Sequence, residues 1–162
     1  MKLRELEIKD AEKMLKWMHD DFVVEKLHTN FRAKKIDDCA EFIKNCQNEV
    51  NIHRAIVDEE DEYLGTVSLK NICNASAEFA IVIAREAMGK GYAKKAMQEM
   101  IRTGFNEYGI ERIYWCVSPD NARALRFYDK NGFSRVTPEV CDIKGDYSSE
   151  EIERFIWYKI DK

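Results

Sequence analysis

The stretch Ile81–Tyr92 reads IVIAREAMGKGY and joins an apolar run to a long amphipathic segment through two closely spaced glycines. The apolar run predicts a buried strand, and Gly89 and Gly91 predict a tight loop. Beyond them, apolar and small residues recur at helical spacing from Ala93 to Tyr108. A strand, a glycine loop and a helix N-terminus in this order present free backbone amides, which favours binding of a phosphate group.

Two common phosphate-binding loops can be tested against this spacing. A Walker A loop, G-x-x-x-x-G-K-[ST], fails because Ala84 stands at its first glycine and Gly91 follows Lys90. A dinucleotide fingerprint, G-x-G-x-x-G or G-x-G-x-x-A, fails because Lys94 takes its third small position. An ordinary strand–loop–helix turn would not by itself need two glycines at this spacing. The loop therefore indicates a phosphate ligand other than a nucleoside triphosphate or a nicotinamide dinucleotide.

Composition limits the remaining partners. The 162 residues suit one domain, 1–162, and 26 basic against 30 acidic residues leave a net charge of -4. Without a basic excess, we expect no nucleic-acid partner. No run reaches the roughly 18 apolar residues of a membrane span, and the N-terminus has no signal-peptide core, so we expect no membrane association and a cytoplasmic location. Five cysteines without a C-x-x-C pair argue against a disulfide framework and a metal site.

Hydrophobic periodicity predicts an α/β fold in the order β-α-α-β-β-β-α-β-α-β-β. The expected strands are 3–8, 52–57, 63–69, 78–83, 113–117, 133–136 and 154–160. The expected helices are 11–18, 38–50, 93–108 and 121–130, the first capped by Asp10 and the second by Asp37. Residues 22–35 are ambiguous, and 137–153 are expected to form a long polar loop. Single helices between strands favour parallel pairing and hairpins favour antiparallel pairing, so we expect a mixed, twisted sheet with helices on both faces.

A second motif, NARALRFYDKNGF, occupies Asn121–Phe133. At ~100° per residue, Ala124 and Tyr128 lie within about 60° of Asn121 around a helix, so the three side chains share one face. Taken alone, Tyr128 is best explained as a half-buried aromatic residue whose hydroxyl bonds to the backbone. Its spacing from Asn121 and the glycine loop upstream favour a functional role instead.

Together the two segments resemble the GCN5-related N-acetyltransferase (GNAT) superfamily. Met88–Ala93 is similar to its acetyl-coenzyme-A loop, Arg/Gln-x-x-Gly-x-Gly/Ala, and departs from it at Met88. Asn121–Phe133 is similar to its Asn-x-x-Ala-x-x-x-Tyr-x-x-x-Gly-Phe. The opening Leu-Arg-x-Leu, followed by Asp10-Ala11-Glu12, most resembles the ribosomal-protein-acetylase-like branch.

The resemblance implies a single GNAT-like domain, with a central twisted mixed sheet of about seven strands flanked by about four helices. It also implies acetyl-CoA (coenzyme A) as the cosubstrate. The acceptor, a small-molecule or peptide amine, is implied to lie against the first two helices and their connection, residues 17–31. The implied cofactor-binding residues are Ile81, Val82, Ile83, Met88, Gly89, Lys90, Gly91, Tyr92, Ala93, Asn121, Ala124 and Tyr128.

Acetyl transfer from a thioester to an amine, by direct attack in a ternary complex, has three requirements. The amine must lose a proton, the carbonyl oxygen needs a hydrogen-bond donor, and the leaving thiolate needs an acid. Tyr128 suits the acid, and the resemblance points to the backbone amide around Val82 as the donor. Glu78, four residues earlier on the same strand face, or a water molecule is expected as the base, with a purely orienting role as the alternative for Glu78. His28 and His53 are weaker candidates.

Three questions stay open at this stage. The acceptor could be a protein N-terminal amine, a polyamine or an amino sugar linked to a nucleotide; His19, Asp20, Asp21 and the acidic turn 58–62 are either its ligands or solvated surface. The alternative to an enzyme is a coenzyme-A-binding sensor or partner protein on the same scaffold. A homodimer is considered, with the last strand and the segment 137–153 as candidate surfaces.

Overall fold

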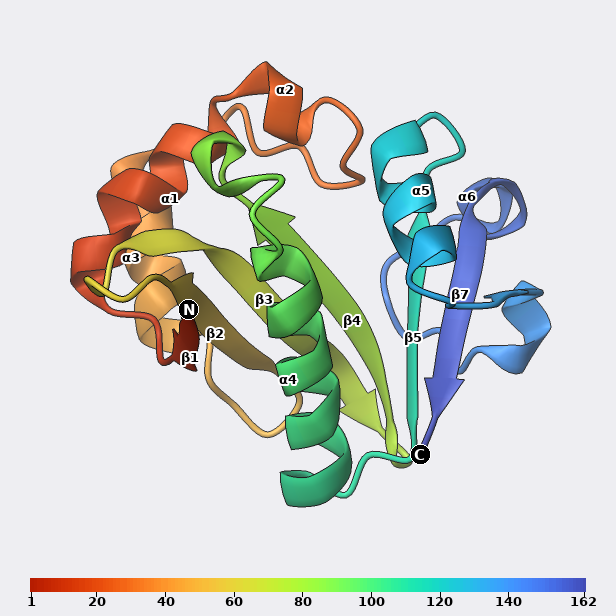
Figure 1. Ribbon diagram of the computed structural model, residues 1–162. Coiled ribbons are helices and arrows are strands. Elements are labelled where there is room, and N and C mark those ends of the chain that lie inside the picture. The colour runs from red at the N-terminus through yellow and green to blue at the C-terminus, as the bar shows by residue number, and fades with distance from the viewer.

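A computed structural model describes all 162 residues, which form one seven-stranded sheet. Figure 1 shows helices on both faces of this sheet. The strands lie in the order β1-β2-β3-β4-β5-β7-β6. Every neighbouring pair is antiparallel except β4 and β5, which are parallel. The mixed sheet predicted from the sequence is therefore confirmed. The strand bounds are β1 Lys2–Arg4, β2 Ile52–Val57, β3 Tyr63–Cys73, β4 Ser76–Ile83, β5 Arg112–Val117, β6 Arg135–Val136 and β7 Ile156–Asp161.

Four main helices and two short ones accompany the sheet. The loop predicted for 137–153 is wrong at its end, because α6 starts there. Ser148 Oγ accepts the N–H of Glu151 at 3.2 Å, and the Glu151 carboxylate accepts the Ser148 N–H at 2.9 Å. This capping box is a local helix signal that the polar composition hides. The helix bounds are α1 Ala11–Met18, α2 Asp21–Val24, α3 Ile36–Asn45, α4 Tyr92–Glu107, α5 Ala122–Lys130 and α6 Ser149–Arg154.

Ion pairs, rather than the predicted cap, hold the N-terminal segment. Asp10 makes no side-chain cap bond to α1; its carboxylate accepts two hydrogen bonds from Arg4, at 2.7 and 2.8 Å, and the residue is 2% exposed. Arg4 also donates to Asp61 in the acidic turn at 2.9 Å, and Lys9 reaches the same carboxylate at 2.6 Å. The turn 58–62 therefore anchors the chain's first residues, which explains its charge without a substrate.

The two larger of three apolar clusters lie on opposite faces of the sheet. On one face, α4 and α5 pack over β3, β4 and β5 around Met97, Met100 and Tyr128. On the other face, α1 and α3 pack over β2 around Met14 and Cys39. These two clusters, called here the α4 cluster and the α1 cluster, leave the sheet itself as the partition between them.

Strands β4 and β5 are paired over only part of their length, near the middle of the sheet. Their parallel pairing covers only Ser76–Glu78 against Arg112–Tyr114, and beyond it the two strands diverge (Figure 1). On its other edge β4 stays paired with β3, and the N–H of Ala84 donates to the Leu64 carbonyl at 2.8 Å. Part of the edge of β4 that faces β5 is therefore without a strand partner, inside the molecule.

The structure also bears on the expectations for dimerisation, membrane spans, metal sites and cysteines. Strand β7 lies between β5 and β6, so the last strand is not an open edge on which a second copy could pair. No helix is long and apolar enough to cross a bilayer. No three His, Cys, Asp or Glu side chains gather in a way that could hold a metal ion. All five cysteines are free thiols, and three of them are buried.

Candidate active site

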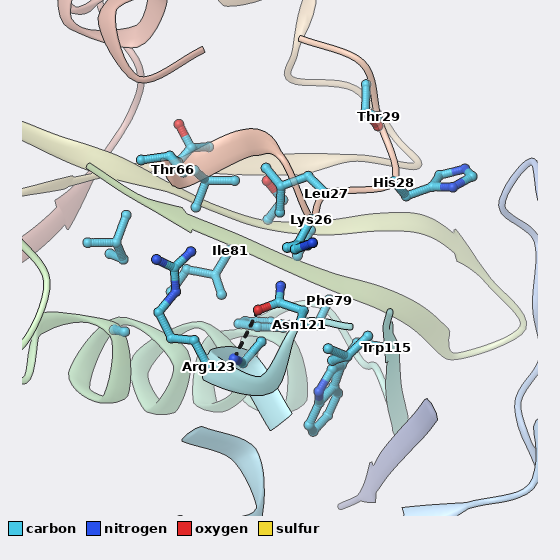
Figure 2. Close-up of a pocket in the computed structure, with 18 of the residues that line it drawn as sticks. Lys26, Leu27, His28, Thr29, Thr66, Phe79, Ile81, Trp115, Asn121 and Arg123 are labelled. Atoms are coloured by element: carbon cyan, nitrogen blue, oxygen red, sulfur yellow. Dashed lines mark hydrogen bonds between the residues drawn. The ribbon is translucent and has the colours of Figure 1, made fainter. Parts of the chain in front are cut away.

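A cavity of about 1210 Å³ opens where β4 and β5 diverge. One end is lined by the glycine loop, the first turn of α4 and the length of α5; the other is lined by α1, the connection between α2 and α3, and α6. Figure 2 shows Lys26, Leu27 and His28 on one side and Asn121 and Arg123 on the other. All the predicted cofactor and catalytic residues line this cavity except Lys90, which is exposed outside it.

The glycine loop has the geometry that anion binding requires. Gly89 and Gly91 have φ angles of 77° and 80°, in the left-handed region that other residues rarely adopt. Gly91 is the N-cap of α4, no side chain caps this helix, and its first turn holds no acidic residue. The first-turn N–H groups and the positive end of the helix dipole are therefore free to meet a negatively charged group.

The edge of β4 corrects the predicted oxyanion donor. Antiparallel partners alternate between hydrogen-bonded and non-bonded pairs, so the bond between Ala84 and Leu64 fixes which residues turn toward β3. By this alternation the N–H of Val82 points to β3, whereas those of Ile81 and Ile83 point to the unpaired edge. The Val82 amide expected from the sequence therefore points away from the unpaired edge, and the amides of Ile81 and Ile83 point toward it.

Helix α5 brings Asn121 and Tyr128 to the same cavity, as their spacing predicted. The Asn121 side-chain oxygen accepts the N–H of Ala124 at 3.2 Å (dashed in Figure 2), so Asn121 caps α5 while its amide Nδ2 makes no bond within the chain. Tyr128 is 6% exposed, packs at 5.2 Å from the rings of both Trp115 and Tyr158, and its hydroxyl has no protein partner. Burial raises the pKa of Tyr128 well above its ordinary value, so the phenol keeps its proton and can donate it.

A buried polar cluster surrounds Glu78, which is 4% exposed, on the other wall of the cavity. Lys70 Nζ and the Tyr147 hydroxyl donate to its Oε1 at 3.1 and 2.7 Å, and Asn71 Nδ2 donates to Oε2 at 3.0 Å. Gly145 covers the remaining side, since a Cβ there would lie 2.7 Å from Oε2. Sequence patterns gave no sign of this cluster, because Tyr147 is 69 residues away and comes from a loop.

The residues at the end of α1 that were candidate ligands for a cationic amine are engaged elsewhere. His19 Nε2 bonds to the Lys34 carbonyl at 2.8 Å. Asp20 caps α2, and Asp21 pairs with Arg32 at 2.8 Å. None of the three candidates lines the cavity. Of the two alternatives, the structure favours surface side chains that serve the local structure.

Trp17 and His28 do line the cavity. Trp17 is 5% exposed, donates through Nε1 to the Tyr63 hydroxyl at 3.0 Å and belongs to the α1 cluster. His28 Nδ1 lies 3.1 Å from the Glu151 carboxylate, and its ring packs on Tyr147 at 4.9 Å. The connection between α2 and α3 thus touches the segment around α6, and the two together wall this end of the cavity.

His53 on β2 also lines the cavity and is 8% exposed. Its Nδ1 is 2.7 Å from the Ser68 hydroxyl, and its ring meets Phe42 edge-on at 4.9 Å. Burial, with smaller contributions from Lys70 and Arg54, lowers the pKa of His53 to about 4. At neutral pH this histidine is uncharged.

Free amides at a helix start, an unpaired strand edge and a protonated phenol lie around one cavity, an arrangement that suits a transferase with a phosphorylated acyl carrier. The acetyltransferase (GNAT) domain model matches residues 1–134. The chain belongs to this family and is a GNAT N-acetyltransferase, and the family implies acetyl-CoA as its cosubstrate.

Individual relatives agree with this assignment. The chain is 28% identical over 139 residues to the uncharacterized N-acetyltransferase p20 of Bacillus licheniformis, which covers 82% of this chain and 78% of the relative. It is 35% identical over 83 residues to spermidine N(1)-acetyltransferase of Escherichia coli, which covers 50% of this chain and only 45% of that protein. The fold matches the crystal structure of spermidine N-acetyltransferase from Vibrio cholerae with CoA and spermine at a TM-score of 0.80 and 23% identity, over 99% of this chain and 94% of the other. These relatives support the superfamily and not specifically the ribosomal-protein-acetylase-like branch.

We expect Gly91→Ala to weaken CoA binding roughly tenfold, because a left-handed backbone costs a residue with a Cβ about 1–2 kcal/mol and the loop would shift to relieve it. Gly109→Ala is the matched control: Gly109 has φ 64°, open space around it and no place in the cavity. Titration calorimetry with CoA should separate the two variants while thermal melts show similar losses of stability. Equal CoA affinity in both variants would remove the loop from the cofactor site.

We expect His53 to make stability depend on pH. The folded chain keeps His53 neutral down to about pH 4, whereas an unfolded histidine takes up its proton near 6.5. The unfolded state therefore binds more protons in this window, and the His53 contribution, complete above pH 6.5, is lost as the pH falls toward 4. Urea unfolding at pH 7, 6 and 5 should show a smaller fall for His53→Gln than for wild type. Parallel curves for the two proteins would contradict this assignment.

Proposed function

We propose that this N-acetyltransferase acetylates a primary amine of a small cationic molecule by direct attack in a ternary complex, with polyamines as the first candidate class. The observation that carries the proposal is the continuity of one cavity from the glycine loop, past the Tyr128 ring, to the polar cluster at Glu78. A carrier and an acceptor entering from the two ends would meet beside the unpaired edge of β4. Two of the named relatives are spermidine acetyltransferases, which supports the polyamine class.

The acceptor end of the cavity suits a flexible amine with an alkyl chain. Its walls include aromatic rings, among them Trp17, Phe31 and Phe42, which favour both methylene groups and ammonium groups. Carboxylates and basic side chains line it in equal number, so no strong overall charge selects the ligand. The lining carboxylates at this end are Glu25, Asp38, Glu78 and Glu151, and the basic side chains are Lys26, Lys34, Lys70 and Arg154.

In the proposed mechanism the leaving thiolate receives its proton from Tyr128. The hydroxyl has no internal partner and burial keeps it protonated, so it is available to a sulfur atom carried along α5. The amides of Ile81 and Ile83 would stabilise the charge that develops on the carbonyl oxygen. Asn121 Nδ2 would hold the pantetheine arm.

Of the two bases considered, we propose water. The Glu78 carboxylate already accepts from Lys70, Asn71 and Tyr147, and Gly145 covers its remaining side. A proton could reach it only by displacing one of these groups. Its role in the proposal is to fix Lys70 and Tyr147 beside the acceptor, while a water molecule takes the proton from the amine.

A panel of amines tests the proposal through the release of free thiol from acetyl-CoA. Spermidine, spermine and putrescine form the first arm, a hexosamine the second and a peptide with a free N-terminus the third. We expect polyamines to raise thiol release well above hydrolysis. Turnover only with the peptide would move the chain toward the ribosomal-protein-acetylase-like function. Tight CoA binding with no amine above background would leave the non-catalytic CoA sensor, for which Met88 is the one sequence hint.

We expect Tyr128→Phe to lower kcat about 10²-fold to 10⁴-fold, because it removes the acid and keeps the ring that packs on Trp115. The affinity for CoA should change less than about twofold, as calorimetry would show. A large loss of affinity with little loss of turnover would make Tyr128 a packing residue.

Glu78→Gln is the comparison variant for the base. With water as the base, its kcat/KM should rise with pH along the same curve as that of wild type, at a lower level. Loss of the rising limb together with a fall of more than about 100-fold would make Glu78 the base.

Light scattering on the same samples measures the oligomeric state, and a monomer would contradict the homodimer hypothesis.

A further inference from the structure

Position 88 lacks the side chain that the family pattern places there. Met88 stands at the Arg/Gln position of the acetyl-coenzyme-A loop and lines the cavity, where it packs against both the α4 cluster and the α1 cluster. A thioether donates no hydrogen bond and carries no charge. A side chain that binds a phosphate group at this place therefore has to come from another element.

Arg123, in the first turn of α5, reaches this place. Its Nη1 lies 3.5 Å from Met88 Sδ, so the guanidinium occupies the space beside the missing side chain. Figure 2 shows it extending from α5 into the cavity. Its Nη2 donates to the Phe22 carbonyl at 3.3 Å, and its Cζ lies 4.7 Å from the centre of the Phe22 ring. These contacts orient the guanidinium before any ligand arrives.

The charge of Arg123 has no partner. Arg85 stacks on the same Phe22 ring at 4.4 Å, but it has the Asp20 carboxylate at 3.8 Å. Arg123 forms no ion pair, although it lies in a chain with more acidic than basic residues. An unpaired guanidinium beside two left-handed glycines and an uncapped helix start is a second, independent source of positive charge at the same place.

We propose that Arg123 is the side chain that binds the pyrophosphate of the cofactor, in place of the arginine or glutamine absent at position 88. The proposal rests on the use of acetyl-CoA proposed above. A guanidinium presents two parallel N–H donors that match two phosphate oxygens, and its charge strengthens both bonds. Lys94 also lines the cavity but offers a single point charge, and Lys90 lies outside it.

The test compares R123Q with R126Q. Arg126 lies on the same helix, is exposed, forms no ion pair and stays outside the cavity, so both substitutions remove one positive charge from α5. Three ligands separate the phosphate groups: CoA, 3′-dephospho-CoA, which keeps the pyrophosphate, and acetyl-pantetheine, which has no phosphate. Calorimetry measures the first two, and ligand-observed NMR the third.

We expect R123Q to weaken CoA and 3′-dephospho-CoA alike by roughly 10-fold to 100-fold, the usual range for hydrogen bonds to a charged group. R126Q should stay within about twofold of wild type, and neither variant should change the affinity for acetyl-pantetheine. R123K, which keeps the charge without the fork, should fall between R123Q and wild type.

Other outcomes overturn the proposal in distinguishable ways. Equal CoA affinity of R123Q and R126Q, with tight binding by wild type, would remove Arg123 from the site and leave the proposed function standing. A loss confined to CoA would assign Arg123 to the 3′-phosphate instead. A loss that includes acetyl-pantetheine would mean that Arg123 acts by packing on Phe22. A wild-type protein that binds no CoA at all would overturn the proposed function itself.

Discussion

The separation of β4 from β5 is the constraint on which the site depends. The two strands are the only parallel pair in the sheet, and their pairing stops at Glu78 and Tyr114. Aromatic packing supports β5 at Trp115, which stacks on Tyr158 with rings 5.6 Å apart and 7° from parallel and meets Tyr128 at 5.2 Å. Because β5 is held on this side and β4 on the β3 side, a cavity opens between them with backbone amides along one wall.

The charge of the molecule is arranged so that an anion can be bound despite a net charge of -4. Acidic groups near the N-terminus form ion pairs with basic side chains, as Asp10 and Asp61 do with Arg4. At the glycine loop the backbone itself contributes positive character, through the uncapped start of α4. Such a site keeps its charge at any pH at which the fold survives, since amides do not titrate.

Local sequence patterns predicted most of the fold and the residues at the carrier end of the site. The strand ending at Ile83, the glycines and the long helix α4 were predicted because period, loop and helix start lie next to one another in the chain. The face shared by Asn121 and Tyr128 was predicted for the same reason. The acceptor end could not be, because the contacts of Glu78 with Lys70 and Tyr147 depend on sheet register and on a loop. The role of the acids after α1 stayed open for a related reason: Asp21 has its partner, Arg32, inside the ambiguous segment 22–35.

The separation of the α1 cluster from the α4 cluster has an evolutionary consequence. Side chains of the α1 cluster, such as Trp17 and Val23, lie at the acceptor end, whereas those of the α4 cluster support the carrier end. Substitutions separated by a sheet and sharing no neighbours change stability almost independently. Related proteins can therefore change their acceptor through substitutions in the α1 cluster, while the α4 cluster at the carrier end stays the same. Met88 contacts both clusters, so a substitution there affects the packing of both.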